Sequence, residues 1–373
     1  MSKIKIVTVV GTRPELIRLS SVINKLDILF DHILVHTGQN YDYELNEIFF
    51  NDLSLRKPKY FLNASAQNSI KTIANILVGV EEVLVKEKPD AFLILGDTNS
   101  CLSLYVAKRL KIPTFHIEAG NRCFDERVPE EINRKIVDHI ADINMTYSTI
   151  SRNYLVKENY PPQRIIKVGS PMLEVINKHL EKINNSKILK KLNLNKKNFF
   201  VVSCHREEII NSDTMFNKFI RILNKLAETY NKKIILSTHP RTLKKINKSS
   251  IELSSLVYLH QPFGFIDYVN LQINSLVTLS DSGTINEEAS ILSIPAINLR
   301  ETHERPEAME EGSTLMVGMD LKRVIHSVEV LIGNGEISKA YMVKDYSDEN
   351  FSERVIRTII SHINYVNTYI WHK

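Results

Sequence analysis

The chain has 373 residues, of which 43% are hydrophobic and 24% are charged, with a formal net charge of +5. This length allows two domains with separate cores, and the composition indicates a soluble, globular protein. No apolar run reaches the ~18 residues that a membrane helix needs, and the first residues lack a signal-peptide pattern. We therefore expect a cytoplasmic protein with no membrane partner.

The cysteine and basic residues argue against two further classes. Cys101, Cys123 and Cys204 are odd in number and lack CxxC spacing, which disfavours a disulfide framework or a zinc site. Basic residues are densest at 182–198 but form no stripe with interleaved aromatic residues. No nucleic-acid partner is expected.

Short β-branched runs, each followed by a segment of helical period, predict an α/β fold with parallel sheets. The predicted strands are residues 3–10, 32–38, 91–97, 114–120, 142–147, 165–170, 199–205, 233–239, 256–260, 275–283, 295–300 and 313–318. Two Rossmann-like domains follow, which we place at residues 1–169 and 170–356. Because such sheets bind ligands beyond the carboxyl ends of their strands, we expect a site in a cleft where the two domains face each other.

The first predicted strand ends in "VGTRPE", where Gly11 permits a tight turn and Pro14 suits the first turn of a helix. Arg13 then lies at a helix N-terminus, a position suited to phosphate binding. The alternative is an ordinary turn with a solvated arginine. The motif is not GxGxxG, so no dinucleotide cofactor is indicated.

Two carboxylates, Asp97 and Glu118, end neighbouring predicted strands. Paired acids at one sheet edge suit proton transfer, because like charges and partial burial raise a carboxyl pKa. Asp97 has a structural alternative as the N-cap of a helix that begins near Asn99. Glu118 interrupts an apolar strand without a comparable structural reason. A polar loop beyond it carries further charges: Arg122, Asp125 and Arg127.

The next segment predicts a helix from Pro129, with acids near its positive end. Isoleucines at i, i+4 and i+8 predict its buried stripe: Ile132, Ile136 and Ile140. Glu130 with Arg134, and Glu131 with Lys135, predict i, i+4 ion pairs. This structural interpretation explains the helix without any chemistry.

In the second half, His205 and Arg206 follow one predicted strand, and His239 and Arg241 follow the next. Histidine with arginine at successive strand ends would stabilise a diphosphate leaving group. A metal site is the rival interpretation. The histidines lack HxxxH spacing and a neighbouring Cys or His cluster, which argues against it.

The segment "LSDSGTINEEA" ends a strand and opens a helix through Ser282, Gly283 and Thr284. Amides of such a turn bind phosphate, and an acid one turn into the helix, here Glu288, accepts both hydroxyls of a ribose. The alternative is a plain acidic helix start. Arg305, at another helix start, would add a sugar or phosphate contact. Phe263 and Tyr268 would flank a uracil ring, or else belong to the core.

Seven motifs, in order over residues 10–312, resemble the non-hydrolysing UDP-N-acetylglucosamine 2-epimerase family: "VGTRPE", "GDTNS", "HIEAGNR", "PEEINR", "CHREE", "DSGTINEEA" and "ETHERPEAMEEG". Within it, "AGNRCFDERVPEEINRKIVDH" most resembles the capsule and O-antigen branch. That branch converts UDP-2-acetamido-2,6-dideoxy-L-talose to UDP-N-acetyl-L-fucosamine. The resemblance implies the GT-B architecture, a homodimer, and a C-terminal helix at about residues 357–373 that crosses back onto the first domain.

The resemblance also implies a mechanism. The C2 proton is removed and UDP is eliminated, which leaves a bound 2-acetamidoglycal; UDP then adds back with protonation on the opposite face. No nicotinamide, other cofactor or metal takes part. The acid/base candidates are Asp97, Glu118 and Glu130, and His205 would act at the diphosphate.

By the same resemblance, the residues that contact the UDP-sugar would be Arg13, Arg18, Arg122, His205, Phe263, Tyr268, Ser282, Gly283, Thr284, Glu288 and Arg305. Arg18 stands where the family commonly has lysine, and Thr284 where it often has glycine. The loop at 37–47 differs from the "TGQHREM" type of the N-acetylglucosamine enzymes. This difference argues against that substrate and against activation by a second UDP-N-acetylglucosamine.

Other functions stay open at this stage. They are a UDP-N-acetylglucosamine/UDP-N-acetylmannosamine 2-epimerase, a hydrolysing 2-epimerase, a GT-B glycosyltransferase and a non-catalytic nucleotide-sugar sensor. A transferase usually needs one base in its first half, and a sensor needs none. Three acids around one cleft therefore favour an epimerase.

Overall fold

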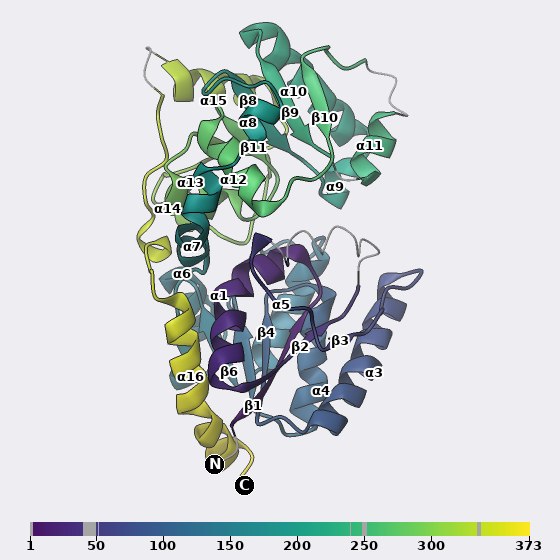
Figure 1. The fold of residues 1–373 in the computed structure, drawn as a ribbon, viewed down its shortest axis with the longest axis vertical. Helices are drawn as coiled ribbons and strands as arrows, with labels where there is room; N and C mark the ends of the chain where they lie inside the picture. The colour runs from purple at the N-terminus through teal and green to yellow at the C-terminus, as the bar shows by residue number, and fades with distance from the viewer. Residues whose placement is uncertain (1–2, 40–49, 51, 239, 248–251, 334–336) are drawn as a thin grey trace. The chain divides into compact units, whose positions relative to one another are not determined.

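The computed structural model describes the chain except residues 1–2, 40–49, 51, 239, 248–251 and 334–336, and except the side chains at 207–208 and 240–241 (Figure 1). It divides into two compact units. Unit 1 comprises residues 1–178 and 345–373, and unit 2 comprises residues 179–344. The domain boundaries at 169/170 and 356/357 stay predictions.

The described part of unit 1 forms one parallel sheet in the order β3-β2-β1-β4-β5-β6-β7. Its strands are β1 (Lys5–Val10), β2 (Asp31–His36), β3 (Tyr60–Phe61), β4 (Ala91–Leu95), β5 (Thr114–Ile117), β6 (Ile143–Thr146) and β7 (Ile165–Lys167). The six strands predicted here are confirmed, whereas the two-residue β3 was not predicted. The strand order reverses between β1 and β4, and ligands of such sheets bind beside that point. The residues that follow β1 and β4 are therefore placed for function.

The helices of unit 1 cover this sheet (Figure 1). They are α1 (Arg13–Leu29), α3 (Ser69–Glu87), α4 (Leu104–Arg109), α5 (Pro129–Ile140), α6 (Thr149–Lys157) and α16 (Phe351–Tyr365), while α7 (Met172–Asn184) leads into unit 2. The C-terminal α16 packs along α1, where Lys25 and Glu353 form an ion pair of 3.1 Å. Among the described residues, no helix has both the length and the apolar content to cross a bilayer.

Unit 2 repeats the design with a parallel sheet in the order β10-β9-β8-β11-β12-β13. Its strands are β8 (Phe199–Ser203), β9 (Lys233–Ser237), β10 (Val257–His260), β11 (Thr278–Ser280), β12 (Ala296–Asn298) and β13 (Leu315–Met316). All six predicted strands are confirmed. The order reverses between β8 and β11, so the residues after these strands occupy the ligand position.

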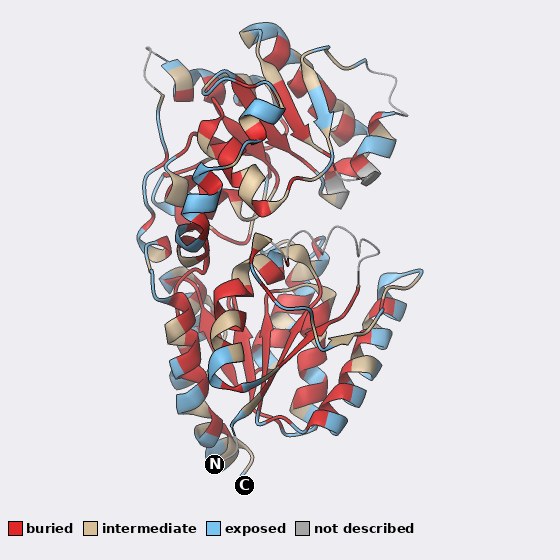
Figure 2. Cartoon of the chain, in the orientation of Figure 1, coloured by how far each residue is buried: buried red, intermediate tan, exposed pale blue. Residues whose placement is uncertain are grey.

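The helices of unit 2 surround that second sheet. They are α8 (Ile188–Lys191), α9 (Glu207–Ile210), α10 (Asp213–Tyr230), α11 (Pro240–Ile246), α12 (Phe265–Asn274), α13 (Ile285–Leu292), α14 (Glu307–Glu310) and α15 (Leu321–Ile332). Figure 2 shows that most strands are buried, whereas the middle of β10 and the outward faces of many helices are exposed. Both units are α/β and Rossmann-like, which confirms the predicted fold class.

The isoleucine stripe predicted for α5 is wrong. Ile132 is 50% exposed and Ile136 is 44% exposed, and Ile140 is only partly buried. The buried face instead carries charged and polar side chains: Glu131, Asn133, Arg134 and Asp138. These groups are tolerated in the interior because each has a hydrogen-bond or ion-pair partner there, so hydrophobic period alone misassigned the helix face.

Candidate active site

Glu118 follows β5 directly and its side chain is only 3% exposed. Its Oε2 accepts hydrogen bonds from Arg18 Nη1 at 2.6 Å and from the Tyr147 hydroxyl at 3.2 Å. The backbone of Glu118 has φ of 69°, a left-handed conformation that is uncommon outside glycine and is found at functional sites. At least two donors, Arg18 and Tyr147, thus hold a buried carboxylate at a strained strand end.

Asp97 lies one strand away, just beyond β4. Arg134 Nε donates to its Oδ2 at 2.7 Å, and Asn133 Nδ2 donates to its backbone oxygen at 2.9 Å. Thr98, not Asp97, occupies the N-cap position of the short helix that begins at Asn99, so the N-cap alternative is wrong. Asp97 instead fastens α5 to the end of β4. Because β4 and β5 are adjacent strands, Asp97 and Glu118 lie at the same sheet edge.

Glu15 connects the segment that follows β1 with the segment that follows β4, although sequence reasoning did not assign it a role. Its Oε2 accepts from the backbone N–H groups of Gly11 at 2.5 Å and Thr12 at 3.2 Å, and its Oε1 accepts from the Thr98 hydroxyl at 2.5 Å. Burial raises the pKa of Glu15 to about 7, despite these hydrogen bonds. The T-x-x-E spacing of a capping box was the sequence signal that would have revealed it.

The first turn of α5 contains two acids in different settings. Glu131 is fully buried; it accepts from the backbone N–H groups of Cys123 and Phe124, each at 3.1 Å, and pairs with Arg134 at 2.5 Å. Burial raises the pKa of Glu131, but these hydrogen bonds outweigh it and hold the pKa below its usual value. The predicted Glu131–Lys135 ion pair is wrong, because Lys135 pairs with Glu126 at 2.8 Å.

Glu130 precedes Glu131 at the start of α5, and its side chain is partly buried. Arg13 is the first residue of α1 and is partly buried as well. Both residues thus lie on the segments that follow strand ends, as the sequence indicated. Their roles in acid/base chemistry and phosphate binding stay predictions.

Arg122 lies in a buried ion-pair network. Its Nη1 donates to Asp138 Oδ2 at 2.6 Å, while Nε and Nη2 donate to the two carboxylate oxygens of Glu158 at 2.8 and 2.6 Å. Burial would lower the pKa of Arg122, but the two carboxylates raise it above the usual value. Asp138 also contacts His116 Nδ1 at 2.9 Å. This arrangement gives Arg122 a structural role, and its predicted UDP-sugar contact stays a prediction.

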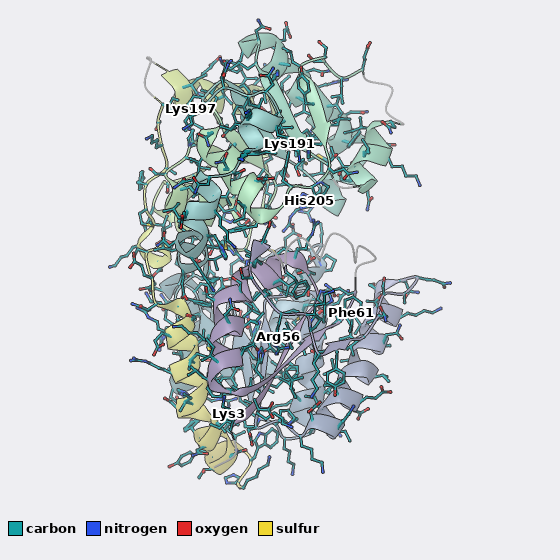
Figure 3. All side chains as sticks on the ribbon, in the orientation of Figure 1. Lys3, Arg56, Phe61, Lys191, Lys197 and His205 are labelled. Carbon is teal, nitrogen blue, oxygen red and sulfur yellow. The ribbon has the colours of Figure 1, made fainter. Side chains whose placement is uncertain are left out.

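In unit 2, Asp281 organises the ends of β8 and β11. Its Oδ2 accepts from the backbone N–H groups of His205 and Arg206, each at 2.8 Å, and its Oδ1 lies 3.7 Å from His205 Nδ1. The His205 side chain remains 48% exposed at the carboxyl edge of this sheet (Figure 3). An exposed imidazole at this edge is available to a ligand, as the diphosphate prediction requires.

The turn that opens α13 is tightly built. The Ser282 and Thr284 hydroxyls lie 2.9 Å apart, and the Ser280 hydroxyl accepts from the Ser282 N–H at 3.0 Å. A Cβ on Gly283 would lie 2.4 Å from Glu304 Oε1, so only glycine fits without moving that carboxylate. The turn therefore has the compact backbone that a phosphate approaches, although no contact tests this role.

Two acids on α13 have buried partners. Gln272 Nε2 donates to Glu288 Oε2 at 2.7 Å, which orients the acid predicted to bind ribose. Arg305 Nη1 donates to Glu287 Oε2 at 2.5 Å, and both side chains are buried. Arg305 is thus tied to α13, and its predicted sugar or phosphate contact stays a prediction.

The predicted uracil-flanking residues differ in their surroundings. Phe263 stacks on His260 with ring centroids 4.0 Å apart and an interplanar angle of 11°. Tyr268 packs against the cluster around Phe199. Burial raises the pKa of Tyr268 above its usual range. These contacts also fit the core alternative for both residues.

Some sequence candidates lie outside the described residues. They are His239, the side chain of Arg241, and residues 40–47 of the loop that was compared with the N-acetylglucosamine enzymes.

Comparison with known proteins decides the family. A family model described as UDP-N-acetylglucosamine 2-epimerase matches residues 24–360. This chain belongs to the UDP-N-acetylglucosamine 2-epimerase family.

Relatives with the same or a similar name align with nearly the full length of this chain. A UDP-N-acetylglucosamine 2-epimerase structure from Rickettsia bellii is 46% identical, covers 100% of both chains and has a TM-score of 0.92. The enzyme from Methanocaldococcus jannaschii, solved with UDP-GlcNAc and UDP, is 32% identical over 96% of this chain and 100% of that chain, with a TM-score of 0.88. The UDP-2,3-diacetamido-2,3-dideoxy-D-glucuronate 2-epimerase of Pseudomonas aeruginosa is 30% identical, with 88% of this chain and 92% of the relative aligned.

These findings confirm the predicted family and enzyme class. The chain is an isomerase of the UDP-sugar 2-epimerase class, with the GT-B type of fold. Within this epimerase, the structure brings Asp97 and Glu118 to one sheet edge of unit 1, and His205 and the Ser282–Thr284 turn to one sheet edge of unit 2. Four buried residues beside the candidate site residues were not assigned a role from the sequence. They are Glu15, Tyr147, Gln272 and Asp281, which bond to Thr98, Glu118, Glu288 and the His205 backbone respectively.

Proposed function

We propose that this epimerase inverts C2 of a UDP-2-acetamido sugar by eliminating UDP and adding it back through a 2-acetamidoglycal. The observation that best supports the proposal is the buried Glu118 carboxylate, which Arg18 and Tyr147 both contact. Pairing with a guanidinium favours the ionised form of a carboxylate. An ionised carboxylate at a strand end is suited to remove a proton from carbon.

In the proposed elimination, Glu118 accepts the C2 proton, a double bond forms between C1 and C2, and the C1–O bond breaks. The electron pair of that bond leaves with UDP. In the return step the UDP oxygen adds to C1, while an acid on the opposite face protonates C2. Asp97 and Glu130 are the candidates for that acid, because each lies on a segment beside the strand end of Glu118.

Unit 2 would bind the UDP part of the substrate. The compact Ser282–Thr284 turn offers its backbone to a phosphate, and Glu288, oriented by Gln272, would accept the ribose hydroxyls. His205 is held at its backbone by Asp281 while its ring stays exposed. A positive or donating imidazole there would stabilise the diphosphate as it leaves.

For the sugar, we propose UDP-2-acetamido-2,6-dideoxy-L-talose, converted to UDP-N-acetyl-L-fucosamine for capsule or O-antigen synthesis. The resemblance of residues 119–139 to that branch supports this choice. The relatives named for UDP-N-acetylglucosamine support the alternative pair, UDP-N-acetylglucosamine and UDP-N-acetylmannosamine. The relative named for a diacetamido-glucuronate shows that the family includes more than one sugar.

The test is incubation with a panel of UDP-2-acetamido sugars, both 6-deoxy-L and D forms, followed by NMR at C2. We expect epimerisation of the 6-deoxy-L substrate. If UDP-N-acetylglucosamine is epimerised and the 6-deoxy-L sugar is not, the proposed substrate is wrong and the alternative pair is correct. We also propose that the enzyme works as a cytoplasmic homodimer without a cofactor, metal, membrane or nucleic acid; analytical ultracentrifugation tests the dimer.

A further inference from the structure

Tyr147 is a buried residue that the sequence did not connect with chemistry. It follows β6, the strand beside β5, and it is only 2% exposed. Its hydroxyl donates to Glu118 Oε2 at 3.2 Å, and the same oxygen accepts from Arg18 at 2.6 Å. Two donors from different parts of unit 1 therefore converge on one carboxylate oxygen.

The ring of Tyr147 is held by the C-terminal helix. Its edge meets the ring of Phe351, the first residue of α16, with centroids 6.0 Å apart and an angle of 84°. The next residue, Ser352, is anchored to Glu174: its N–H donates to Oε2 at 2.8 Å and its hydroxyl to Oε1 at 2.5 Å. A chain of contacts thus links the start of α16 to Tyr147 and then to Glu118.

The hydrogen bond from Tyr147 limits the orientations that the Glu118 carboxylate can adopt. Glu118 has a left-handed backbone, so its side chain leaves the strand end in a direction that the sheet itself does not fix. An additional donor from another element restricts the rotation of a carboxylate about its last bond. Small displacements of a reacting group cost about 10²-fold in rate.

We propose that Tyr147 is a positioning residue for the epimerase reaction, which orients the Glu118 carboxylate through the hydrogen bond to Oε2 and is itself held by Phe351. This inference rests on the proposed function, in which Glu118 transfers the C2 proton. The competing view is that Tyr147 only fills the core. The two views differ in whether loss of the hydroxyl alone changes the rate.

The experiment compares Tyr147→Phe with the matched control Tyr160→Phe. Tyr160 is another buried tyrosine of unit 1, and its hydroxyl donates to the backbone oxygen of Ala141. Each variant loses one hydroxyl and keeps its ring. C2 proton exchange in D2O, kcat, KM and Tm are measured for both and for the wild type.

We expect Tyr147→Phe to lower kcat and C2 exchange by about tenfold, the effect of one hydrogen bond to a charged group, with KM within about twofold. Tyr160→Phe should match the wild-type rate even if its Tm falls. In a Glu118→Gln background, Tyr147→Phe should cause no further loss, because the group that it orients is absent.

Equal rates for Tyr147→Phe and Tyr160→Phe, with the wild type active, would overturn this inference and leave the proposed function standing. A wild type without C2 exchange would overturn both. If Tyr147→Phe does not fold, Phe351→Leu replaces it, since this change loosens the ring and leaves the hydroxyl in place. A drop in kcat of about threefold or more at unchanged KM supports the inference, and an unchanged kcat overturns it.

Discussion

The carboxylate of Asp281 accepts a hydrogen bond from the backbone N–H of His205 at 2.8 Å, so the acid that follows β11 holds the loop that follows β8. The same oxygen binds the N–H of Arg206 at 2.8 Å. The backbone of the loop at His205 and Arg206, which we propose binds the diphosphate, is therefore held by Asp281, a buried acid that follows the neighbouring strand.

Replacement of Asp281 should weaken UDP binding. Asp281→Ala leaves two backbone N–H groups without their acceptor, and we expect a UDP Kd about 10- to 100-fold higher and a stability loss of about 1–3 kcal/mol. Isothermal titration calorimetry and denaturant unfolding measure both. Asp320→Ala is the matched control, because Asp320 caps α15 through the Arg323 N–H at 2.8 Å. It should cost about 1 kcal/mol and leave UDP affinity unchanged; equal UDP affinity in both variants would refute the role of Asp281.

Loss of the Glu118 charge should separate binding from chemistry. Glu118→Gln keeps the size of the side chain but cannot accept a proton from C2, so exchange should fall at least about 10²-fold while UDP affinity stays within a few-fold. NMR of C2 exchange and calorimetry with UDP give the two values. Normal exchange would remove Glu118 from proton transfer.

Glu15 predicts a specific pH dependence of stability. Burial raises its pKa from 4.5 to about 7, so between these pH values the folded state binds more protons than the unfolded state. Its contribution to stability is therefore complete below pH 4.5 and is lost as the pH rises through 7, by about 3 kcal/mol in all. Glu15→Gln should lack this loss in denaturant unfolding at pH 5 and pH 8.

The comparison with Glu15→Gln isolates this effect from other groups. Burial lowers the pKa of His36 and of His303 to about 4, which gives stability the opposite slope between pH 4 and 6.5. Both histidines are present in the wild type and in the variant, so their effect cancels in the difference. Identical pH profiles for the two proteins would show that Glu15 titrates normally.

Replacement of Arg122 distinguishes a role in stability from a contact with the substrate. Removal of one partner from a buried ion pair leaves uncompensated charge, and Arg122→Met should cost about 3–5 kcal/mol through Asp138 and Glu158. The folded fraction should retain its KM, which steady-state kinetics at low temperature measures. A raised KM with normal stability would instead support the sugar contact predicted from the sequence.

Hydrophobic period and strand-end motifs were enough to predict both sheets and the edge that carries Asp97 and Glu118. They failed on α5, because its buried face is mostly polar and charged, and such side chains are stable there only with tertiary partners. Arg134, for example, is buried against Asp97, 37 residues earlier in the chain. The sequence shows each charge but not the partner that neutralises it.

Buried partners account for most of what the sequence missed in the site. Gln272 and Tyr147 resemble ordinary residues of a helix and a strand end until the fold brings them to Glu288 and Glu118. Arg122 shows that a motif residue can also have structural partners: it lies in an ion-pair network, and its predicted UDP-sugar contact stays a prediction. Such pairings depend on long-range contacts that no local pattern encodes.

The most direct test of the proposed reaction is turnover of a UDP-2-acetamido sugar in D2O, read by NMR and mass spectrometry at C2. Elimination and re-addition predict one deuterium at C2 of the product, with UDP still attached to the sugar. A product that keeps protium at C2, or a sugar released from UDP, would contradict the proposal.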